Sequence, residues 1–437
     1  MRVAGRLIRR RLWTADILRQ DDAPALLPSP PMSPLRHVGP LAIACWLVTA
    51  TATEAGVVVH LDFTDFRLRL NQAAGASGST PFDTGEAATI QSNVLTALGE
   101  TYQSFDVTFQ TTDGGATETL LLGAADLANS GFYGEAERID YRNRIDGDAA
   151  RVYTENFGFV LESSDLRADQ IRELSGALAG TAAHELGHHL GLSHADSFGN
   201  RGFIYDGLSG PANAGGFQND NLMAAGVTGL SEPQREGFRG LSPFSQLKLE
   251  LAEGLTPGGP TPSLIETLSA HDTLAAAQTV ALVGQAISGF DAANVVGAIA
   301  AFGERDVYRF TLPGPGFLSA ATVTAGVNDA VNTVLTIVDS AGTTLGAVND
   351  TRFIGSQFGT SGGSGSTDST LYGLRIDASG DYFAVVEGFE GDTGDYELLV
   401  GFDADSAAVP EPGTCVLTLL AAGLGVAANR RRRRLAA

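Results

Sequence analysis

After residue 55, the spacing of apolar positions predicts several strands and then one long helix. Short runs rich in β-branched and aromatic residues are typical of strands. Three such runs are 56–63 (GVVVHLDF), 104–112 (SFDVTFQTT) and 152–163 (VYTENFGFVLES). Apolar residues then recur at three- and four-residue steps over 166–191, which predicts a helix that Ser164 or Asp165 can cap.

This predicted helix has two different faces. Its apolar stripe consists of Ile171, Leu174, Leu178, Ala182 and Leu186. His184 lies about 200° around the helix from Leu186, so His184 and His188 share the opposite face. Three small residues also lie on that face, namely Ala177, Gly180 and Thr181. We expect the stripe to pack on a sheet and the histidine face to look into a cleft.

The pattern changes at 255–263 (LTPGGPTPS), which indicates an interdomain linker. Beyond the linker, short alternating runs predict strands separated by Gly- and Asp-rich turns. These runs are 306–312 (DVYRFTL), 332–340 (NTVLTIVDS), 370–377 (TLYGLRID), 380–388 (GDYFAVVEG) and 394–402 (GDYELLVGF). Five or more such strands favour a β-sandwich. The predicted fold class is therefore α+β, with a β-sandwich following a helix-containing domain.

Composition and charge narrow the possible partners. The 437 residues suffice for two or three domains, and 43% hydrophobic residues with 54 glycines suit a globular protein. The ends, 1–52 and 409–437, hold 12 of the 28 basic residues but four of the 50 acidic ones, so the middle has a net charge near −30. So acidic a body repels nucleic acid and anionic membranes. The same charge keeps a secreted protein soluble.

Four of the seven histidines fall within HELGHHLGLSH, residues 184–194. His184 and His188 are four residues apart, so both rings can reach one zinc ion at about 2.0–2.1 Å. Gly191 permits a sharp turn that brings His194 back as a third ligand. The fourth position stays open for water, and Glu185 stands beside the first ligand as a base.

These residues fit H-E-x-x-H-x-x-G-x-x-H at every fixed position, so the region resembles the metzincin zinc peptidases. That resemblance implies a methionine turn beneath the metal, and Met223 in NDNLMAAG is the candidate. Some metzincins have a tyrosine ligand just after this methionine, but here Ala224 and Ala225 follow. A cysteine-switch propeptide is also excluded if the mature region has no cysteine.

The other histidines and Asp196 are weaker candidates for metal ligands. His189 is expected to neighbour the site, either supporting the ligands or partly exposed. His60 and His271 lie far away in sequence and are expected to be structural. Asp196 can orient a ligand imidazole, or it can be a surface-loop acid.

The order of strands in the last third resembles the bacterial pre-peptidase C-terminal domain over about 270–402. Aspartates in FGTSGGSGSTDST and FEGDTGD can bind calcium or be solvated turn residues, and both readings stay open.

The N-terminal end reads as an export signal. From Met32, a short basic region precedes an apolar run over 38–50, and small residues offer cleavage after Ala52 or Ala55. The apolar run is short for a membrane anchor, and Cys45 lies early for a lipoprotein acceptor. Residues 1–31 are either a start-site error or a long basic extension.

The C-terminal end resembles the PEP-CTERM sorting signal of Gram-negative bacteria. Pro410-Glu411-Pro412 precedes about 17 uncharged residues and five arginines, Arg430–Arg434. The resemblance implies transient inner-membrane anchoring, removal of the tail by an exosortase and delivery to the cell surface or extracellular matrix. A plain C-terminal anchor is the alternative. Removal of both ends also removes Cys45 and Cys415, so the cysteine count does not report the redox compartment.

Together these features predict a secreted zinc endopeptidase, or alternatively a catalytically inactive zinc-binding protein of the surface or matrix. The expected parts are an extension at 1–31, a signal peptide at 32–55, a metzincin-like domain at 56–254, a linker at 255–269, a sandwich at 270–402 and a sorting tail at 403–437. The sequence names no protein substrate.

Overall fold

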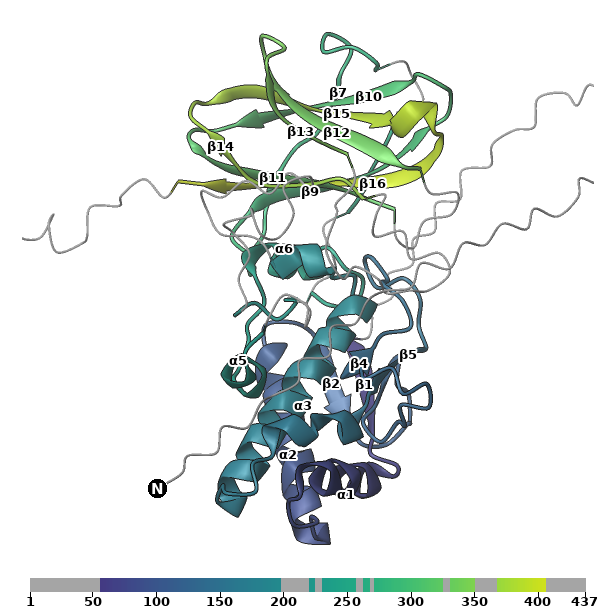
Figure 1. Ribbon diagram of the computed structural model, residues 1–437. Helices are drawn as coiled ribbons and strands as arrows, with labels where there is room; N and C mark the ends of the chain where they lie inside the picture. The colour runs from purple at the N-terminus through teal and green to yellow at the C-terminus, as the bar shows by residue number, and fades with distance from the viewer. Residues whose placement is uncertain are drawn as a thin grey trace, which may run out of the picture. The chain divides into compact units, whose positions relative to one another are not determined.

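The computed structural model describes residues 56–197, 220–224, 230–256, 262–267, 271–324, 331–349 and 368–405. The first part of this range contains a five-stranded sheet with the order β2-β1-β3-β5-β4 (Figure 1). Its strands are β1 Val57–Asp62, β2 Val107–Gln110, β3 Glu118–Leu121, β4 Gly134–Glu135 and β5 Asp148–Val152. All neighbours pair in parallel except β4, which runs antiparallel to β5 at the edge. The strands expected at 56–63 and 104–112 are confirmed.

The prediction of a strand over residues 152–163 is wrong. Strand β5 ends at Val152, and the 3₁₀ helix η1 follows over Thr154–Val160. Its buried residues Phe157 and Val160 are three apart, which is the period of a 3₁₀ helix rather than the two-residue alternation of a strand.

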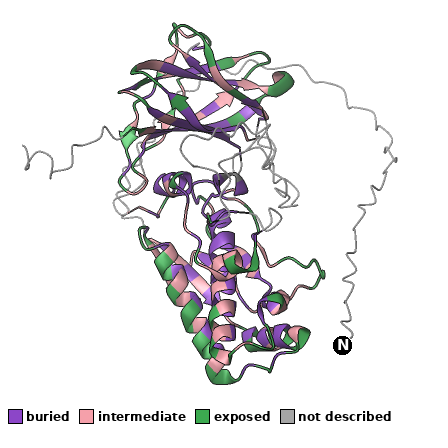
Figure 2. Ribbon diagram, turned by 60° about the vertical axis from the view of Figure 1, so that its left-hand side comes forward, coloured by how far each residue is buried: buried purple, intermediate pink, exposed green. Residues whose placement is uncertain are grey.

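Three helices accompany this sheet, namely α1 Phe66–Ser77, α2 Thr84–Thr101 and α3 Arg167–His189. The long helix expected at 166–191 is α3, and its C-terminal half is almost entirely buried (Figure 2). The expected caps at Ser164 and Asp165 are wrong, because the N-cap is Leu166 and makes no side-chain cap bond. Instead, Arg167 fixes the start of α3 by a bond from Nε to Glu86 Oε1 of α2, at 2.7 Å.

The sandwich consists of two sheets that enclose a shared apolar core. One sheet has the order β13-β12-β15-β10-β7 and the other β14-β11-β16-β9-β6, with β8 paired to β9. The strands are β6 Leu264–Ile265, β7 Gln278–Thr279, β8 Val283–Gly284, β9 Asp291–Ile299, β10 Arg305–Leu312, β11 Gly316–Val323, β12 Thr333–Asp339, β13 Thr344–Asn349, β14 Thr370–Ile376, β15 Gly380–Gly388 and β16 Gly394–Ala404. All five strands expected beyond the linker are confirmed, and the fold class is mixed α and β.

Helix α6, Pro243–Glu250, lies against the sandwich sheet that contains β11 and β14. An apolar cluster joins them, including Phe244 and Leu247 of α6 with Val323 and Tyr372 of the sandwich. Polar bonds add to this contact, because Glu250 accepts from the backbone N–H groups of Ile287 and Ser288.

None of the helices formed by the described residues combines the length and the apolar character needed to cross a bilayer. The expected signal peptide at 32–55 and nearly all of the expected sorting tail lie outside the described residues. The calcium-ligand candidate Asp368 is described, and its Oδ1 accepts from the backbone N–H and the hydroxyl of Thr324, both at 2.7 Å.

Candidate metal centre

The end of α3 and the turn after it bring three histidines together. His184 and His188 lie on the last turns of α3, and the chain then reverses at Gly191, whose φ is +94°. A Cβ built on Gly191 would lie 2.8 Å from the Cα of Tyr141, so glycine is needed for both conformation and space. The turn leads to η2, His194–Ser197, and returns His194 toward the helix. The sequence-based expectation for Gly191 is confirmed.

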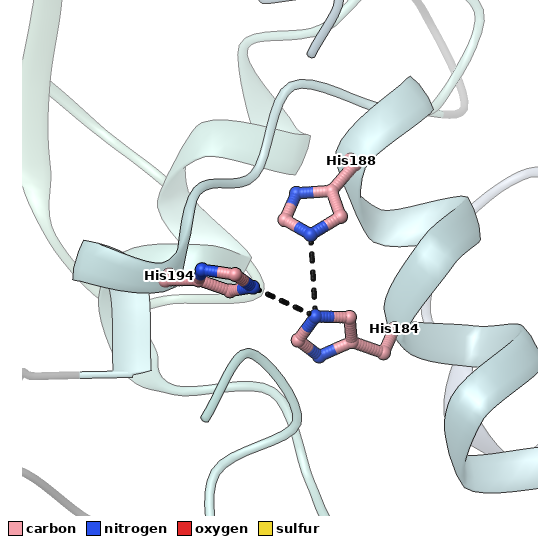
Figure 3. A group of neighbouring side chains, drawn as sticks. All are labelled: His184, His188 and His194. Carbon is pink, nitrogen blue, oxygen red and sulfur yellow. Dashed lines mark hydrogen bonds between the residues drawn. The ribbon is translucent and has the colours of Figure 1, made fainter. Parts of the chain in front are cut away.

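The three imidazoles converge through their Nε2 atoms (Figure 3). His184 Nε2 lies 3.1 Å from that of His194 and 3.2 Å from that of His188. Two nitrogens bound to one tetrahedral zinc at about 2.0–2.1 Å lie about 3.3–3.4 Å apart. All three side chains are buried, with at most 7% of each residue exposed. The spacing therefore suits one small cation.

The opposite ring nitrogens determine where the lone pairs point. Nδ1 of His184 contacts the Leu222 carbonyl at 2.8 Å, and Nδ1 of His188 contacts the Leu192 carbonyl at 2.7 Å. A carbonyl only accepts, so each Nδ1 carries the proton and donates. Burial lowers the pKa of His184 well below its ordinary value and that of His188 to about 4. Both neutral rings therefore direct an Nε2 lone pair at the same point, an arrangement that a cation stabilises.

Glu185 directly follows His184 in α3 and carries a buried carboxylate. It is 4% exposed, and burial raises its pKa to about 8, although a bond from the Ala136 N–H opposes the shift. Its Oε2 atom is buried and has no hydrogen-bond partner among the described residues. A cation held by the histidines would favour the charged form of this carboxylate.

Gly134 of β4 makes room for Glu185. A Cβ built at this position would lie 2.5 Å from Glu185 Oε1 and 2.8 Å from Cγ2 of Thr181. The small face expected on the helix is thus closely approached by the edge strand. Any larger residue than glycine would displace the carboxylate.

Met223 lies beneath the helix. It is fully buried, and a Cβ built on Gly187, between His184 and His188, would lie 2.8 Å from its sulfur. The preceding Leu222 supplies the carbonyl that accepts from His184. Met223, the candidate for the methionine turn, thus packs against α3 between two of the converging histidines, and Ala224 follows it.

The sequence analysis missed Arg239. This guanidinium is 6% exposed and donates from Nη1 to the carbonyls of Leu222 and Ala224, at 3.2 and 3.3 Å. It therefore holds both sides of Met223. No local pattern around position 239 signals that role.

His189 faces away from the three converging rings. Its Nδ1 lies 3.1 Å from Glu118 Oε2, and its Nε2 accepts from the Glu137 backbone N–H. His189 is fully buried, so the expectation of partial exposure is wrong. Asp196 is also fully buried, and the reading of it as a surface acid is wrong.

The remaining described histidines lie in other places. His60 of β1 is 3.9 Å from Asp113. His271 lies in the sandwich, where its Nε2 is 3.8 Å from Glu266 and 3.7 Å from Asp306. Two sets of three potential metal-ligating side chains have ligand atoms within 4.8 Å of one another among the described residues. One set is Glu266, His271 and Asp306, and the other is the three converging histidines.

Comparisons with known proteins identify a motif in the C-terminal tail. Residues 408–434 match the model of the PEP-CTERM protein-sorting motif. The chain therefore carries a PEP-CTERM sorting motif. This motif implies recognition by an exosortase and indicates export in a Gram-negative bacterium with association to the surface.

A search of curated proteins finds no match. Among solved structures, the pre-peptidase C-terminal domain of a collagenase from Bacillus anthracis is similar to part of the chain, at 11% identity and a TM-score of 0.20. The match covers 32% of this chain and 99% of that domain.

Proposed function

We propose that this protein is a secreted zinc-dependent endopeptidase. The observation that carries the proposal is the convergence of three buried Nε2 atoms, the first of them on the residue before Glu185, whose buried Oε2 has no hydrogen-bond partner among the described residues. Neutral imidazoles suit zinc, and three protein ligands leave a position open for reaction. The resemblance of residues 184–194 to the metzincin motif supports the same assignment.

In this proposal, His184, His188 and His194 hold the ion. Zinc, when bound, supplies a Lewis acid that polarises the scissile carbonyl and makes water reactive near neutral pH. Glu185 takes the proton from the attacking water and returns it to the leaving amine. Its buried surroundings keep that proton from bulk solvent.

The edge strand β4 suits a peptide substrate. Among the described strands it pairs only with β5, and its residue Gly134 lies against Glu185. An extended peptide can add to a free sheet edge through main-chain bonds. Such binding would bring a backbone amide next to the carboxylate.

The alternative is an inactive zinc-binding protein of the surface or matrix. A structural zinc site has no use for the carboxylate of Glu185, whose second oxygen lacks a partner among the described residues. The two proposals differ in one property, hydrolysis of peptide bonds.

The test measures zinc content and casein cleavage of the wild-type, His188→Ala and His60→Ala proteins. We expect one zinc per chain in the wild type and in His60→Ala, but loss of zinc and cleavage in His188→Ala. Cleavage by the wild type should stop with a chelator and return with added zinc. Full zinc occupancy in His188→Ala would refute the ligand set, and bound zinc without any cleavage would favour the inactive protein.

A further inference from the structure

The segment that carries His194 has little stability of its own. It is the single 3₁₀ turn η2, four residues long. Short 3₁₀ turns have poor hydrogen-bond geometry and no cooperative support. The position of the His194 ring must therefore be fixed by contacts from elsewhere.

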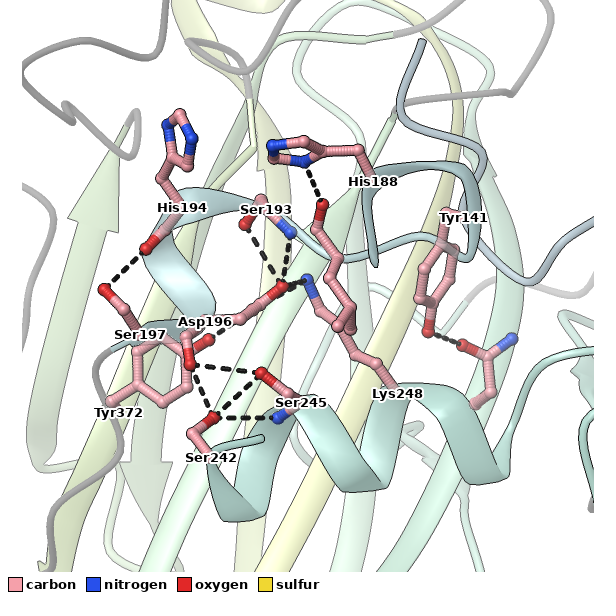
Figure 4. Close-up of polar contacts among 12 residues, drawn as sticks. Tyr141, His188, Ser193, His194, Asp196, Ser197, Ser242, Ser245, Lys248 and Tyr372 are labelled. Carbon is pink, nitrogen blue, oxygen red and sulfur yellow. Dashed lines mark hydrogen bonds and ion pairs between the residues drawn. The ribbon is translucent and has the colours of Figure 1, made fainter. Parts of the chain in front are cut away.

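Asp196 provides those contacts (Figure 4). Its Oδ2 accepts from the backbone N–H of Ser193 at 2.6 Å and from the hydroxyl of Ser193 at 3.3 Å. Its carbonyl accepts from the hydroxyls of Ser242 and Ser245. The side chain thus holds the residue before His194, and the main chain holds the turn against α6.

The carboxylate of Asp196 is fully buried, so it must be paired. Lys248 Nζ of α6 lies 2.9 Å from Oδ1 and 3.0 Å from Oδ2. The remaining partner comes from the sandwich, because the Tyr372 hydroxyl of β14 donates to Oδ1 at 2.6 Å. The Tyr372 ring is itself fixed edge-on against Phe244, with centroids 4.5 Å apart.

We propose that Tyr372 is a positioning residue of the metal centre. Through Tyr372, the C-terminal sandwich helps to hold His194 in the orientation that binds the metal. The chain of contacts runs from the Tyr372 hydroxyl through Asp196 to the turn that presents His194. This inference rests on the proposed zinc site. It implies that proteolytic removal of the sandwich would release zinc from the first domain.

Removal of the Tyr372 hydroxyl is a mild change. In Tyr372→Phe, Lys248 still neutralises Asp196 and the ring still contacts Phe244. The fold should persist, whereas the carboxylate loses one of the bonds that set its orientation. Loss of a group bonded directly to a metal ligand typically weakens metal binding by about 10–100-fold. Tyr372 acts one residue further out, through Asp196, so we expect an effect at the lower end of that range.

The same junction offers a matched control. The Tyr141 hydroxyl donates to Asn294 Oδ1 of β9 at 2.9 Å, so it also joins the first domain to the sandwich. Asp196 is not its partner in that bond. Tyr141→Phe therefore removes an equivalent junction bond and leaves the contacts of Asp196 intact.

The experiment uses the full-length wild-type, Tyr372→Phe and Tyr141→Phe proteins. Zinc affinity is measured by competition with a chromophoric chelator, and ligand geometry by the visible absorption of the Co²⁺-loaded proteins. We expect zinc affinity to fall about tenfold in Tyr372→Phe, with an altered Co²⁺ spectrum. Tyr141→Phe should match the wild type in both.

Equal zinc affinities and spectra in all three proteins would overturn the inference. An equal loss in both variants would also overturn it, because the effect would then belong to the junction as a whole. A wild-type protein that binds no zinc would instead refute the proposed function itself, and this inference with it.

Discussion

Gly134→Ala should impair peptide hydrolysis far more than zinc binding. The built Cβ lies 2.5 Å from Glu185 Oε1, whereas ordinary contact begins at 3.4 Å. The carboxylate must therefore move by about 0.9 Å, and a misplacement near 1 Å of a catalytic group costs about 10²-fold in rate. The same Cβ would also lie 2.7 Å from Glu185 Cγ and 2.8 Å from Thr181 Cγ2, although the φ of Gly134 is not positive. The free energy of unfolding should therefore fall by about 1–3 kcal/mol.

The assay compares kcat/KM on a quenched fluorescent peptide with zinc content and thermal melting. Gly114→Ala is the control, because a Cβ there meets nothing within 4 Å and its φ is also not positive. We expect about a hundredfold loss of kcat/KM in Gly134→Ala, with one zinc still bound. Wild-type turnover in Gly134→Ala would refute the assigned position of Glu185. Loss of zinc would show that the clash spreads beyond the carboxylate.

Further predictions concern the turn, one ion pair and the tail. Gly191→Ala should lower the free energy of unfolding by about 3 kcal/mol and weaken zinc binding, because a positive φ and a backbone clash coincide there; chemical denaturation and zinc titration would check both. The Arg167 side chain lowers the pKa of Glu86 to about 2 from its ordinary value of 4.5, so Glu86→Gln should cost about 1 kcal/mol at pH 7. That difference should disappear as the pH falls from 4.5 to 2, which urea unfolding at each pH would show. Replacement of Arg430–Arg434 by glutamine should leave the sorting tail uncleaved, whereas mass spectrometry of the wild type from its host should find an end near Pro412.

The parts of the fold with a strong local period were predictable from the sequence. The leucine stripe of α3 repeats every three to four residues, and the predicted strands of the sandwich alternate every two, as in β10, where Tyr308, Phe310 and Leu312 are all buried. The convergence of His184, His188 and His194 was also predictable, because a four-residue step on a helix and one glycine turn determine it.

Features that depend on distant contacts were not predictable. Phe157 and Val160 lie in a run rich in apolar residues, and only their packing shows a 3₁₀ helix instead of a strand. Tyr372 contacts Asp196 across 176 positions of sequence. Nothing in the residues around either position indicates that contact, and the same holds for Arg239 and the carbonyls beside Met223.

The comparison of Glu185→Gln with the wild type tests the central claim most directly. Glutamine keeps the size of the side chain but cannot accept a proton from water. With equal zinc content confirmed in both proteins, peptide hydrolysis should fall by several orders of magnitude in the variant. Hydrolysis at the wild-type rate by a zinc-loaded Glu185→Gln protein would contradict the proposed mechanism.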